Sequence, residues 1–526
     1  MEPAPVADAQ TVVALLAKAR NIMLGDTPKL GPPGAFRDMA RVVARIRTAV
    51  ERKERIAIFG DYDCDGITAV AELLRYFWRH GVKPLVRLPH RVRDGYGLTM
   101  AIVDEMKRRK IQLLITCDTG ITAVAEIAAL AGDGTDVIIT DHHHLSEEIP
   151  DAFGILHPGL CAIPPPHPSG AGVVFKLLFA LENGEHWEDM ETDCALAMMG
   201  TVADLVELRG ENRAIVQLGL QALQGIDRGP LMELRERTRM TGRGLKSSDI
   251  AFRIAPRINA AGRMSEPDIA LRALLEGGAS LDALETLNDE RQEKTGLLLE
   301  QIVKDVKGAV LTPFIVRASG DYPHGLLGLL AGKLTETFGR PSLVAAIDGD
   351  TCTASLRSPP CYNIIEGLGR SAKLFRRFGG HAQAAGCTFE RASLPAIEAA
   401  LSDDVRSILS EDDLVPMIMI DAELKAKDIT AGLCNELSLL EPFGQGNPEP
   451  KFLLRNVTIE AARAVGTDGR HLQGNIVGVA CIGFNLAQFA AQCSNIDTVA
   501  HIGLNAWNGR VVPQIVIEDA RVTINN

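Results

Sequence analysis

The sequence predicts an α/β protein with a doubly wound parallel sheet, a long connecting helix, a second α/β domain and a C-terminal β-barrel. Three observations support this fold class. From residue 55, short apolar runs alternate with longer amphipathic stretches, as in β-α-β units of a parallel sheet. Residues 281–310 carry an apolar stripe without proline, which is typical of one long helix. Residues 409–526 are rich in short strand-like runs.

The elements follow one another in this order. Residues 1–45 predict an N-terminal helical appendage to the first domain, because apolar residues recur at helical spacing on both sides of the breaker GDTPKLGPPG. Residues 46–280 hold the parallel-sheet domain, with strands expected in RIAIFG, PLVRLP, QLLITC and DVIITD and a helical section after them. The connecting helix, 281–310, leads to the second mixed domain, 311–408. Residues 409–526 suit an OB-fold of about five strands.

Composition indicates a cytoplasmic protein that does not enter a membrane. The N-terminus, MEPAPVADAQ, lacks the pattern of a secretory signal, and no run of about eighteen apolar residues occurs. The 10 cysteines form no CxxC pair, which fits reduced thiols better than disulfides or structural zinc. The net charge of -12 argues against an ordinary nucleic-acid binder, unless bound cations neutralise acidic residues or basic residues cluster locally.

Acidic residues and histidines follow three of the predicted strands. RIAIFG runs into DYDCDG, QLLITC is followed by Asp118, and DVIIT by DHHH. The carboxyl ends of parallel strands share one edge of a sheet, so these side chains are expected to converge. Another carboxylate lies in the apolar stretch GTVADLVEL, where an unpaired charge would be costly. The predicted metal ligands are Asp61, Asp63, Asp65, Asp118, His142 and Asp204.

Each of these residues also has a simpler interpretation. Asp61 and Asp65 suit the N-cap of a helix after a βα turn, Asp118 suits a turn, and His143 or His144 suits an exposed surface. Three consecutive strands that all end in ligand-type residues favour a metal site. Carboxylate and imidazole ligands suit Mn²⁺ or Mg²⁺, and a pair of such ions would activate water and clamp a phosphoryl group. The sequence therefore predicts a nuclease with two divalent cations.

The motifs DYDCDG, TCDTGI, DHH and TVADLVEL, in this order, resemble the four motifs of the DHH phosphoesterase superfamily. Within it, further blocks are similar to the RecJ family of single-strand-specific bacterial exonucleases. They are PHRVRDGYGL, APRINAAGRM, LNDERQ, HGLLGLLAGKL, ASLRS, GGHAQAAG and EPFGQGNPEP. The resemblance covers the chain from about residue 45 to its end.

The resemblance implies how two metals are held. Asp63 and Asp118 would hold one ion, with Asp61 supporting it. The other ion would be held by Asp65, Asp118, His142 and Asp204, so that Asp118 bridges the pair. Other superfamily members carry a histidine where this chain has Phe59, which implies that water completes the first site.

The resemblance also implies catalytic residues. His143 would contact the scissile phosphate or protonate the leaving oxygen, and Asp141 would orient a histidine from behind. Asn259 and Arg263 would line the cleft and contact the phosphate next to the cut.

A 5′-phosphate pocket is implied as well, made of Arg91, Ser355 and Arg357, because an arginine fork can donate two hydrogen bonds to a phosphate. Surface charge and turn residues are the alternative. Gly379, Gly380 and His381 would let a nucleic-acid strand approach the second domain closely, unless the glycines form a packing turn. A local basic patch is predicted at Lys373, Arg376 and Arg377.

The implied activity is a 5′→3′ exonuclease on single-stranded DNA that releases 5′-mononucleotides in DNA repair and recombination. A single-strand binding protein and a helicase are candidate partners, and the chain is expected to be a monomer. An oligonucleotide or small-phosphate phosphodiesterase of the same superfamily stays open, although such proteins generally lack the barrel. A non-catalytic replication scaffold also stays open, but it should lack ligands that this chain retains. The extra C-terminal domain of the longest relatives is not expected here.

Overall fold

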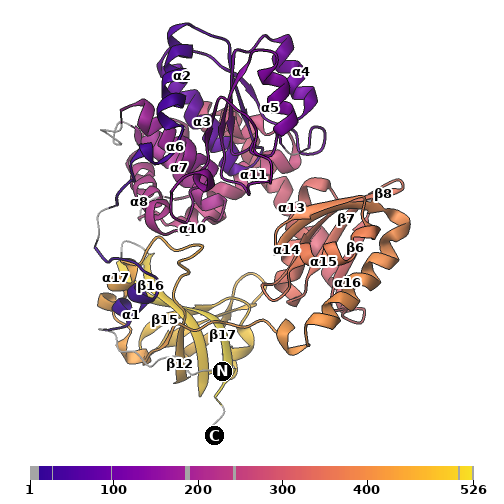
Figure 1. Ribbon diagram of the computed structural model, residues 1–526. Coiled ribbons are helices and arrows are strands. Elements are labelled where there is room, and N and C mark those ends of the chain that lie inside the picture. Colours follow the sequence, from indigo (N-terminus) through magenta and orange to yellow (C-terminus); the bar gives the residue numbers. More distant parts are fainter. Residues whose placement is uncertain are drawn as a thin grey trace.

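The computed structural model describes residues 11–25, 28–95, 97–183, 190–240, 244–507 and 510–523. Within these residues the chain forms three sheets, each the centre of one domain. Figure 1 shows the three domains around a central opening, with the first at the top, the second at the right and the third at the bottom.

The first sheet is parallel throughout and has the order β2-β1-β3-β4-β5. Its strands are β1 (Ile56–Gly60), β2 (Leu85–Arg87), β3 (Leu113–Cys117), β4 (Asp136–Thr140) and β5 (Gly154–Leu156). Alternate β1 residues enter different cores. Ile56 and Ile58 pack with α2 (Met39–Glu51) and α3 (Cys64–Arg79), whereas Ala57 and Phe59 pack with α4 (Met100–Arg108) and α5 (Val124–Ala131). Burial of both faces explains the continuous apolar runs, and the doubly wound sheet is confirmed.

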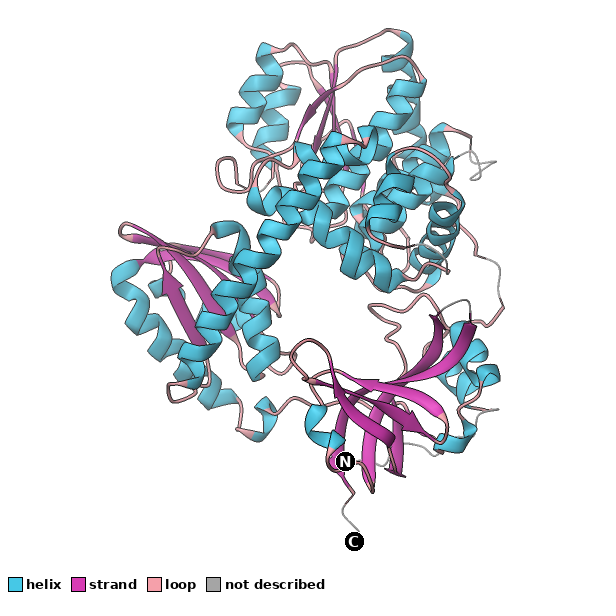
Figure 2. Ribbon diagram, turned by 180° about the vertical axis from the view of Figure 1, so that it is seen from behind, coloured by secondary structure: helices cyan, strands magenta, loops and turns pink. Residues whose placement is uncertain are grey.

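A helical section completes the first domain. It comprises α6 (Gly170–Leu181), α7 (Glu191–Ala203), α8 (Gly210–Gly225), α9 (Pro230–Arg237), α10 (Ser247–Asp249), α11 (Ala255–Met264) and α12 (Asp268–Glu276). The long helix α13 (Ala279–Lys307) then leads to the second domain, as Figure 2 shows from behind. Leu281 and Leu284 anchor its start in the first core, and Ile302 and Val306 anchor its end in the second domain. The predicted connecting helix is confirmed.

The second domain has a five-stranded mixed sheet of order β6-β7-β8-β10-β9. Its strands are β6 (Ile315–Ser319), β7 (Ser342–Asp348), β8 (Thr351–Arg357), β9 (Arg377–Gly380) and β10 (Ala384–Glu390). The strands β6 and β7 pair in parallel and the other pairs are antiparallel. One face packs against α14 (Leu327–Phe338) and the other against α15 (Ile364–Arg370) and α16 (Leu394–Ile408).

The third domain contains a seven-stranded sheet in the described residues, two strands more than the prediction of about five. The order is β11-β12-β16-β17-β15-β14-β13. The strands are β11 (Ala422–Glu423), β12 (Phe452–Val457), β13 (Glu460–Val465), β14 (His471–Ile476), β15 (Val479–Gly483), β16 (Ile496–Trp507) and β17 (Arg510–Val522). The helix α17 (Ala431–Ser438) packs on this sheet.

The N-terminal helix α1 (Val12–Ala19) packs on the third domain, so the prediction that residues 1–45 attach to the first domain is wrong for this helix. Val12, Val13 and Leu16 are buried in the core of the β-domain. The apolar stripe of α1 predicts that the helix covers a core, but it does not specify which one. By contrast, α2 packs on the first sheet through Val42 and Ile46.

In the part of the chain that the structure describes, no helix combines the length and apolar character needed to cross a membrane.

Candidate active site

The predicted metal ligands gather at the carboxyl edge of the first sheet. Asp61, Asp63 and Asp65 follow β1, Asp118 follows β3 and His142 follows β4, while Asp204 caps the end of α7. The predicted ligands form two compact groups, with Asp61, Asp63 and Asp118 in the first and Asp65, His142 and Asp204 in the second. Within each group the carboxylate and imidazole ligand atoms lie within 4.8 Å of one another. A third such group joins Asp118 and His142 to His143.

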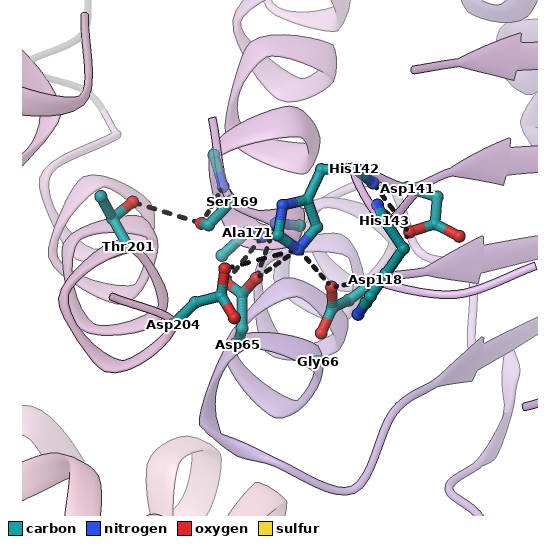
Figure 3. Close-up of polar contacts among 12 residues, drawn as sticks. Asp65, Gly66, Asp118, Asp141, His142, His143, Ser169, Ala171, Thr201 and Asp204 are labelled. Atoms are coloured by element: carbon teal, nitrogen blue, oxygen red, sulfur yellow. Dashed lines mark hydrogen bonds and ion pairs between the residues drawn. The ribbon is translucent and has the colours of Figure 1, made fainter. Parts of the chain in front are cut away.

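His142 lies at the centre of the second group, as Figure 3 shows. Its Nε2 atom is 3.1 Å from Asp118 Oδ1, 3.5 Å from Asp204 Oδ2 and 3.8 Å from Asp65 Oδ2. His142 Nε2 and Asp118 Oδ1 are both buried without a hydrogen-bond partner. Unsatisfied buried polar atoms that face one another are costly unless a ligand occupies the space between them. The donor set therefore fits a divalent cation that accepts oxygen and nitrogen ligands.

Asp118 is held in place by the backbone around it. Its φ of 60° puts a non-glycine residue in the left-handed region, immediately after β3. Across the site, Gly170 approaches so closely that an added Cβ would lie 2.5 Å from Asp118 Cβ. An added Cβ at Gly200 of α7 would lie 2.4 Å from Asp65 Oδ1. These two glycines let α6 and α7 close over the carboxylates.

The alternative interpretation of the first motif was a helix N-cap at Asp61 or Asp65. A helix N-cap is present, but at Asp63. The N-cap of α3 is Asp63, whose Oδ1 accepts hydrogen bonds from the backbone N–H groups of Asp65 and Gly66, both at 3.1 Å. Asp65 instead accepts hydrogen bonds from Gly170 N at 2.6 Å and Ala171 N at 3.0 Å, at the start of α6. Asp63 thus orders the turn and still lies in the first ligand group.

Like charges at this edge perturb one another strongly. Burial, followed by repulsion from Asp63, raises the pKa of Asp61 to about 8 and of Asp65 to about 6. Burial and repulsion from Asp65 raise the pKa of Asp204 to about 9 and that of Asp118 well above its usual range. Carboxylates in this condition are stabilised in their charged form by cations.

His142 and His143 are adjacent, but their pKa values are shifted in opposite directions. Burial lowers the pKa of His142 to about 4, so the ring is neutral and can act as a ligand. Burial alone would also lower the pKa of His143, but the hydrogen bond and charge of Asp141 raise it to about 9. His143 Nδ1 lies 2.8 Å from Asp141 Oδ1. Asp141, only 1% exposed, also accepts hydrogen bonds from the backbone of Ile121, at 2.9 Å, and of His142, at 2.7 Å.

A cavity of about 790 Å³ opens beside the cluster and lies between the first and second domains. Its lining includes nine residues that the sequence singled out: Asp61, Asp63, Arg91, His143, Arg263, Ser355, Arg357, Gly380 and His381. Arg377 of the predicted basic patch also lines it. The acidic cluster and the predicted phosphate pocket therefore share one space.

Arginines from separate elements form one wall of this cavity. Arg91 follows β2 by four residues and stacks on the Tyr62 ring at 4.1 Å from its centroid. Arg357 Nη1 donates to Ser355 Oγ at 3.2 Å. Burial, then repulsion from Arg91, Arg291 and Arg357, lowers the pKa of Arg263 to about 10. Clustered buried cations of this kind favour a bound anion.

Arg291 on α13 is a member of this arginine group that sequence reasoning did not single out. Its side chain is close enough to repel Arg263, and its Nη2 donates to Asn288 Oδ1 at 2.9 Å. The block LNDERQ contains both residues, so the resemblance indicates this segment but assigns no role to Asn288 or Arg291.

Three other predicted residues have local structural roles. Asn259 does not line the cavity, and its Oδ1 accepts a hydrogen bond from Cys64 N at 2.9 Å, at the start of α3. Gly379 pairs with Gly386 in the β9–β10 ladder. Gly380 has a φ of 142°, and a Cβ there would lie 2.4 Å from Ala384 O, so packing alone already requires glycine.

His381 brings the second domain against the histidine motif. Its ring centroid lies 5.2 Å from that of His144. Both rings line a second cavity of about 600 Å³, together with His142, His143, His157, His167 and Asp204. Residues of the acidic and histidine cluster therefore line two separate cavities.

Comparisons with known proteins agree with this arrangement. Three family models match: the DHH family N-terminal domain at residues 55–201, the DHHA1 domain at 310–410 and the RecJ OB domain at 420–519. The single-stranded-DNA-specific exonuclease RecJ of Bacillus subtilis is 34% identical over 512 residues, covering 93% of this chain and 64% of that protein. The protein of the same name from Thermus thermophilus is 33% identical, covering 94% of this chain and 72% of that protein.

Solved structures are similar as well. The crystal structure of Thermus thermophilus RecJ in complex with Mn²⁺ matches with a TM-score of 0.85 and 30% identity, covering 98% of this chain and 76% of that one. The corresponding complex with Mg²⁺ matches with a TM-score of 0.77 at 29% identity, covering 98% and 75%. A manganese-bound exonuclease RecJ matches with a TM-score of 0.62, covering 73% and 97%. The present chain spans less than two thirds of the Bacillus subtilis protein.

Proposed function

Because this chain belongs to the RecJ family, we propose that it is a metal-dependent 5′→3′ exonuclease that degrades single-stranded DNA to 5′-mononucleotides. One observation carries the proposal. The acidic and histidine cluster and the arginine wall face the same cavity, so a strand end held by the arginines would present its first phosphodiester to the cluster.

The proposed ligand sets follow the two geometric groups. Asp61, Asp63 and Asp118 would hold one divalent cation, and Asp65, His142 and Asp204 the other. Asp118 Oδ1 lies 3.1 Å from His142 Nε2 and also belongs to the first group, which supports a bridging position. The Thermus structures with Mn²⁺ and Mg²⁺ support these two ions as cofactors. When bound, a metal pair lowers the pKa of water and neutralises charge on the phosphoryl oxygens.

The remaining side chains would position the strand and move a proton. His143, charged and tied to Asp141, lines the cavity and is placed to neutralise the reacting phosphate or to protonate the leaving oxygen. Arg263 would contact the phosphate next to the cut. We propose a different role for Asn259, which orders the start of α3 and thereby the turn that carries Asp63 and Asp65.

Selection of a 5′ end would come from Arg91, Ser355 and Arg357. A terminal phosphate carries more negative charge than an internal phosphodiester, so the arginine wall would bind the end in preference to the middle of a strand. His381 and Gly380 would border the same space. The OB domain would hold the strand further from the cut.

We also propose domain limits at 46–280, 281–310, 311–408 and 409–526, with α1 assigned to the last of these domains. A single-strand binding protein and a helicase stay predictions from the resemblance. The family relationship and the C-terminal barrel do not favour the small-phosphate phosphodiesterase.

A time course on single strands labelled at the 5′ or the 3′ end, with Mn²⁺, Mg²⁺ or a chelator, tests the proposal. We expect immediate release of 5′-labelled mononucleotide, slow shortening of the 3′-labelled strand, and no cleavage with chelator. Internal cuts, attack from the 3′ end, or full activity with chelator would contradict it.

A further inference from the structure

The segment 439–447, here named the joint segment, connects α17 to the strands of the OB domain and contains most of the EPFGQGNPEP block. It is internally braced by Asn447, which is fully buried. Asn447 Nδ2 donates to Leu440 O at 2.8 Å and to Pro442 O at 2.9 Å, and Gly444 N donates to Asn447 O at 2.9 Å. The joint segment is therefore a loop held by internal hydrogen bonds, and several of its carbonyls accept hydrogen bonds from outside it.

Those carbonyls bind the first domain. Leu208 N donates to Gln445 O at 2.8 Å, and Arg209 Nε donates to Gly446 O at 3.0 Å. One turn into α8, Arg213 Nη1 donates to Leu440 O at 2.9 Å. The OB domain is thus fixed to the residues that run from the end of α7 into α8.

The joint segment and residues 207–208 of the first domain are in close contact. A Cβ added to Gly444 would lie 2.7 Å from Leu208 Cδ1, and Leu208 is only 2% exposed. A Cβ added to Gly446 would lie 3.0 Å from Glu207 Cβ. Both glycines permit a close approach that a larger residue would prevent.

The docked residues lie directly next to a proposed metal ligand. Asp204 caps α7, and Leu205, with a φ of 59°, turns the chain toward Leu208. The turn 204–208 is consequently held at both ends, by α7 on one side and by the joint segment on the other. At its first residue, Asp204 Oδ2 lies 3.5 Å from His142 Nε2.

The N-terminal part of the chain contacts both the joint segment and the start of α8. Arg20, after α1, donates to Asn447 Oδ1 at 3.1 Å and pairs with Asp421 at 2.8 Å. Gly31 N then donates to Glu211 Oε1, at the start of α8, at 2.8 Å. Arg20 therefore contacts the joint segment, and Gly31 contacts the first domain at the start of α8.

We propose that the joint segment positions Asp204, so that docking of the OB domain sets the affinity of the metal site formed by Asp65, His142 and Asp204. Because this inference rests on the proposed function, metal binding is measured separately from cleavage. A barrel displaced from the joint would leave the turn 204–208 held only by α7, and Asp204 would no longer be fixed beside His142. The first ligand group, which has no member in this turn, would keep its affinity.

Mn²⁺ titration of the full chain, followed by the electron paramagnetic resonance of free Mn²⁺, tests the inference. Gly444→Val pushes on Leu208, whereas Gly432→Val in α17 is a matched control whose added Cβ would meet only Thr430 Oγ1, at 3.5 Å. We expect two ions per chain in the unmodified protein and in Gly432→Val. In Gly444→Val the affinity for one ion should fall about 10- to 100-fold, as when a side chain that supports a metal ligand is lost.

Gly444→Val with Leu208→Ala makes room for the valine, and we expect it to restore the weakened site. Melting temperatures of the metal-free proteins are measured alongside. If Gly444→Val does not fold, Arg213→Gln removes the contacts to the joint carbonyls without added bulk and should also weaken one site. Unchanged binding of both ions in the folded variant, or no recovery in the double variant, overturns the inference. Absence of Mn²⁺ binding in the unmodified protein would instead overturn the proposed function.

Discussion

The acidic cluster and the arginine wall of the same cavity are both groups of like charges, but they are built differently. All six proposed ligand residues of the acidic cluster come from the first domain, and five of them lie within five residues of the end of β1, β3 or β4. The arginines come from the chain after β2, from α11 and from β8, so two domains must meet to form the wall.

The charges in each group destabilise one another. Burial and repulsion raise the pKa of Asp118 and of Asp204, and they lower the pKa of Arg263. Each cluster therefore favours a ligand of the opposite sign, cations for the first and phosphate for the second. In the proposed function, the acidic cluster would carry out hydrolysis and the arginines would bind the strand end within the same cavity.

Removal of the bridging carboxylate should cause the largest loss. Asp118→Ala takes away the ligand that belongs to the first group and lies 3.1 Å from the centre of the second. We expect kcat to fall by about 10³-fold or more, because preorganised charge at the reacting phosphate is lost. Binding of single-stranded DNA should remain, since the arginine wall is intact. Asp104→Ala on the exposed side of α4 is the control, and full activity of Asp118→Ala would exclude the bridging role.

A second variant separates recognition from hydrolysis. Arg357→Glu reverses one charge of the wall while leaving every proposed metal ligand in place. We expect kcat/KM on 5′-phosphorylated strands to fall about 10- to 100-fold, as for a lost hydrogen bond between charged groups. Strands with a 5′-hydroxyl should lose little. Equal losses on both substrates would contradict an end pocket.

The difference between the two walls also explains what the sequence could predict. In the acidic cluster, most of the proposed ligands come shortly after a strand in the sequence. Because parallel strands place their carboxyl ends at one edge of the sheet, the sequence alone predicts that these ligands converge. The pairing of Asp63 with the N-terminus of α3, where Asp61 or Asp65 was expected, depends on one turn of backbone geometry that the spacing does not specify.

Tertiary contacts were harder to foresee. The stripe of α1 predicts burial but not the domain that provides it, and Arg291 comes close to Arg263 only because α13 packs beside α11. The resemblance predicts that Asn259 lies near the phosphate. In the structure its amide oxygen accepts a hydrogen bond from Cys64 N, which is 195 positions away in the sequence. The sequence shows the joint segment as a motif. Its proposed role follows only from the contact between this segment and the residues after α7.

The pH dependence of cleavage should report the charge on His143. Its pKa of about 9 is raised, so the charged form is present below that value and is lost as the pH rises through it. We expect kcat/KM to decline above about pH 9. Asp141→Asn removes the carboxylate that holds this charge, so the decline should begin at lower pH, with a loss of about tenfold at pH 8. An unshifted profile in Asp141→Asn would show that His143 does not act through its charge.

The smallest effect is expected at the edge of the arginine wall. Arg291 lies near enough to repel Arg263 but is not among the residues that line the cavity. A charge that acts only through space is worth about 0.2–1 kcal/mol, so Arg291→Gln should raise KM for 5′-phosphorylated strands about two- to fivefold without changing kcat. Lys294→Gln, exposed one turn further along the same helix, is the matched control. Since salt screens such interactions, the difference between the two variants should vanish at high ionic strength. A loss of more than about tenfold that persists in salt would mean that Arg291 contacts the strand directly, and the wall would then extend onto the connecting helix.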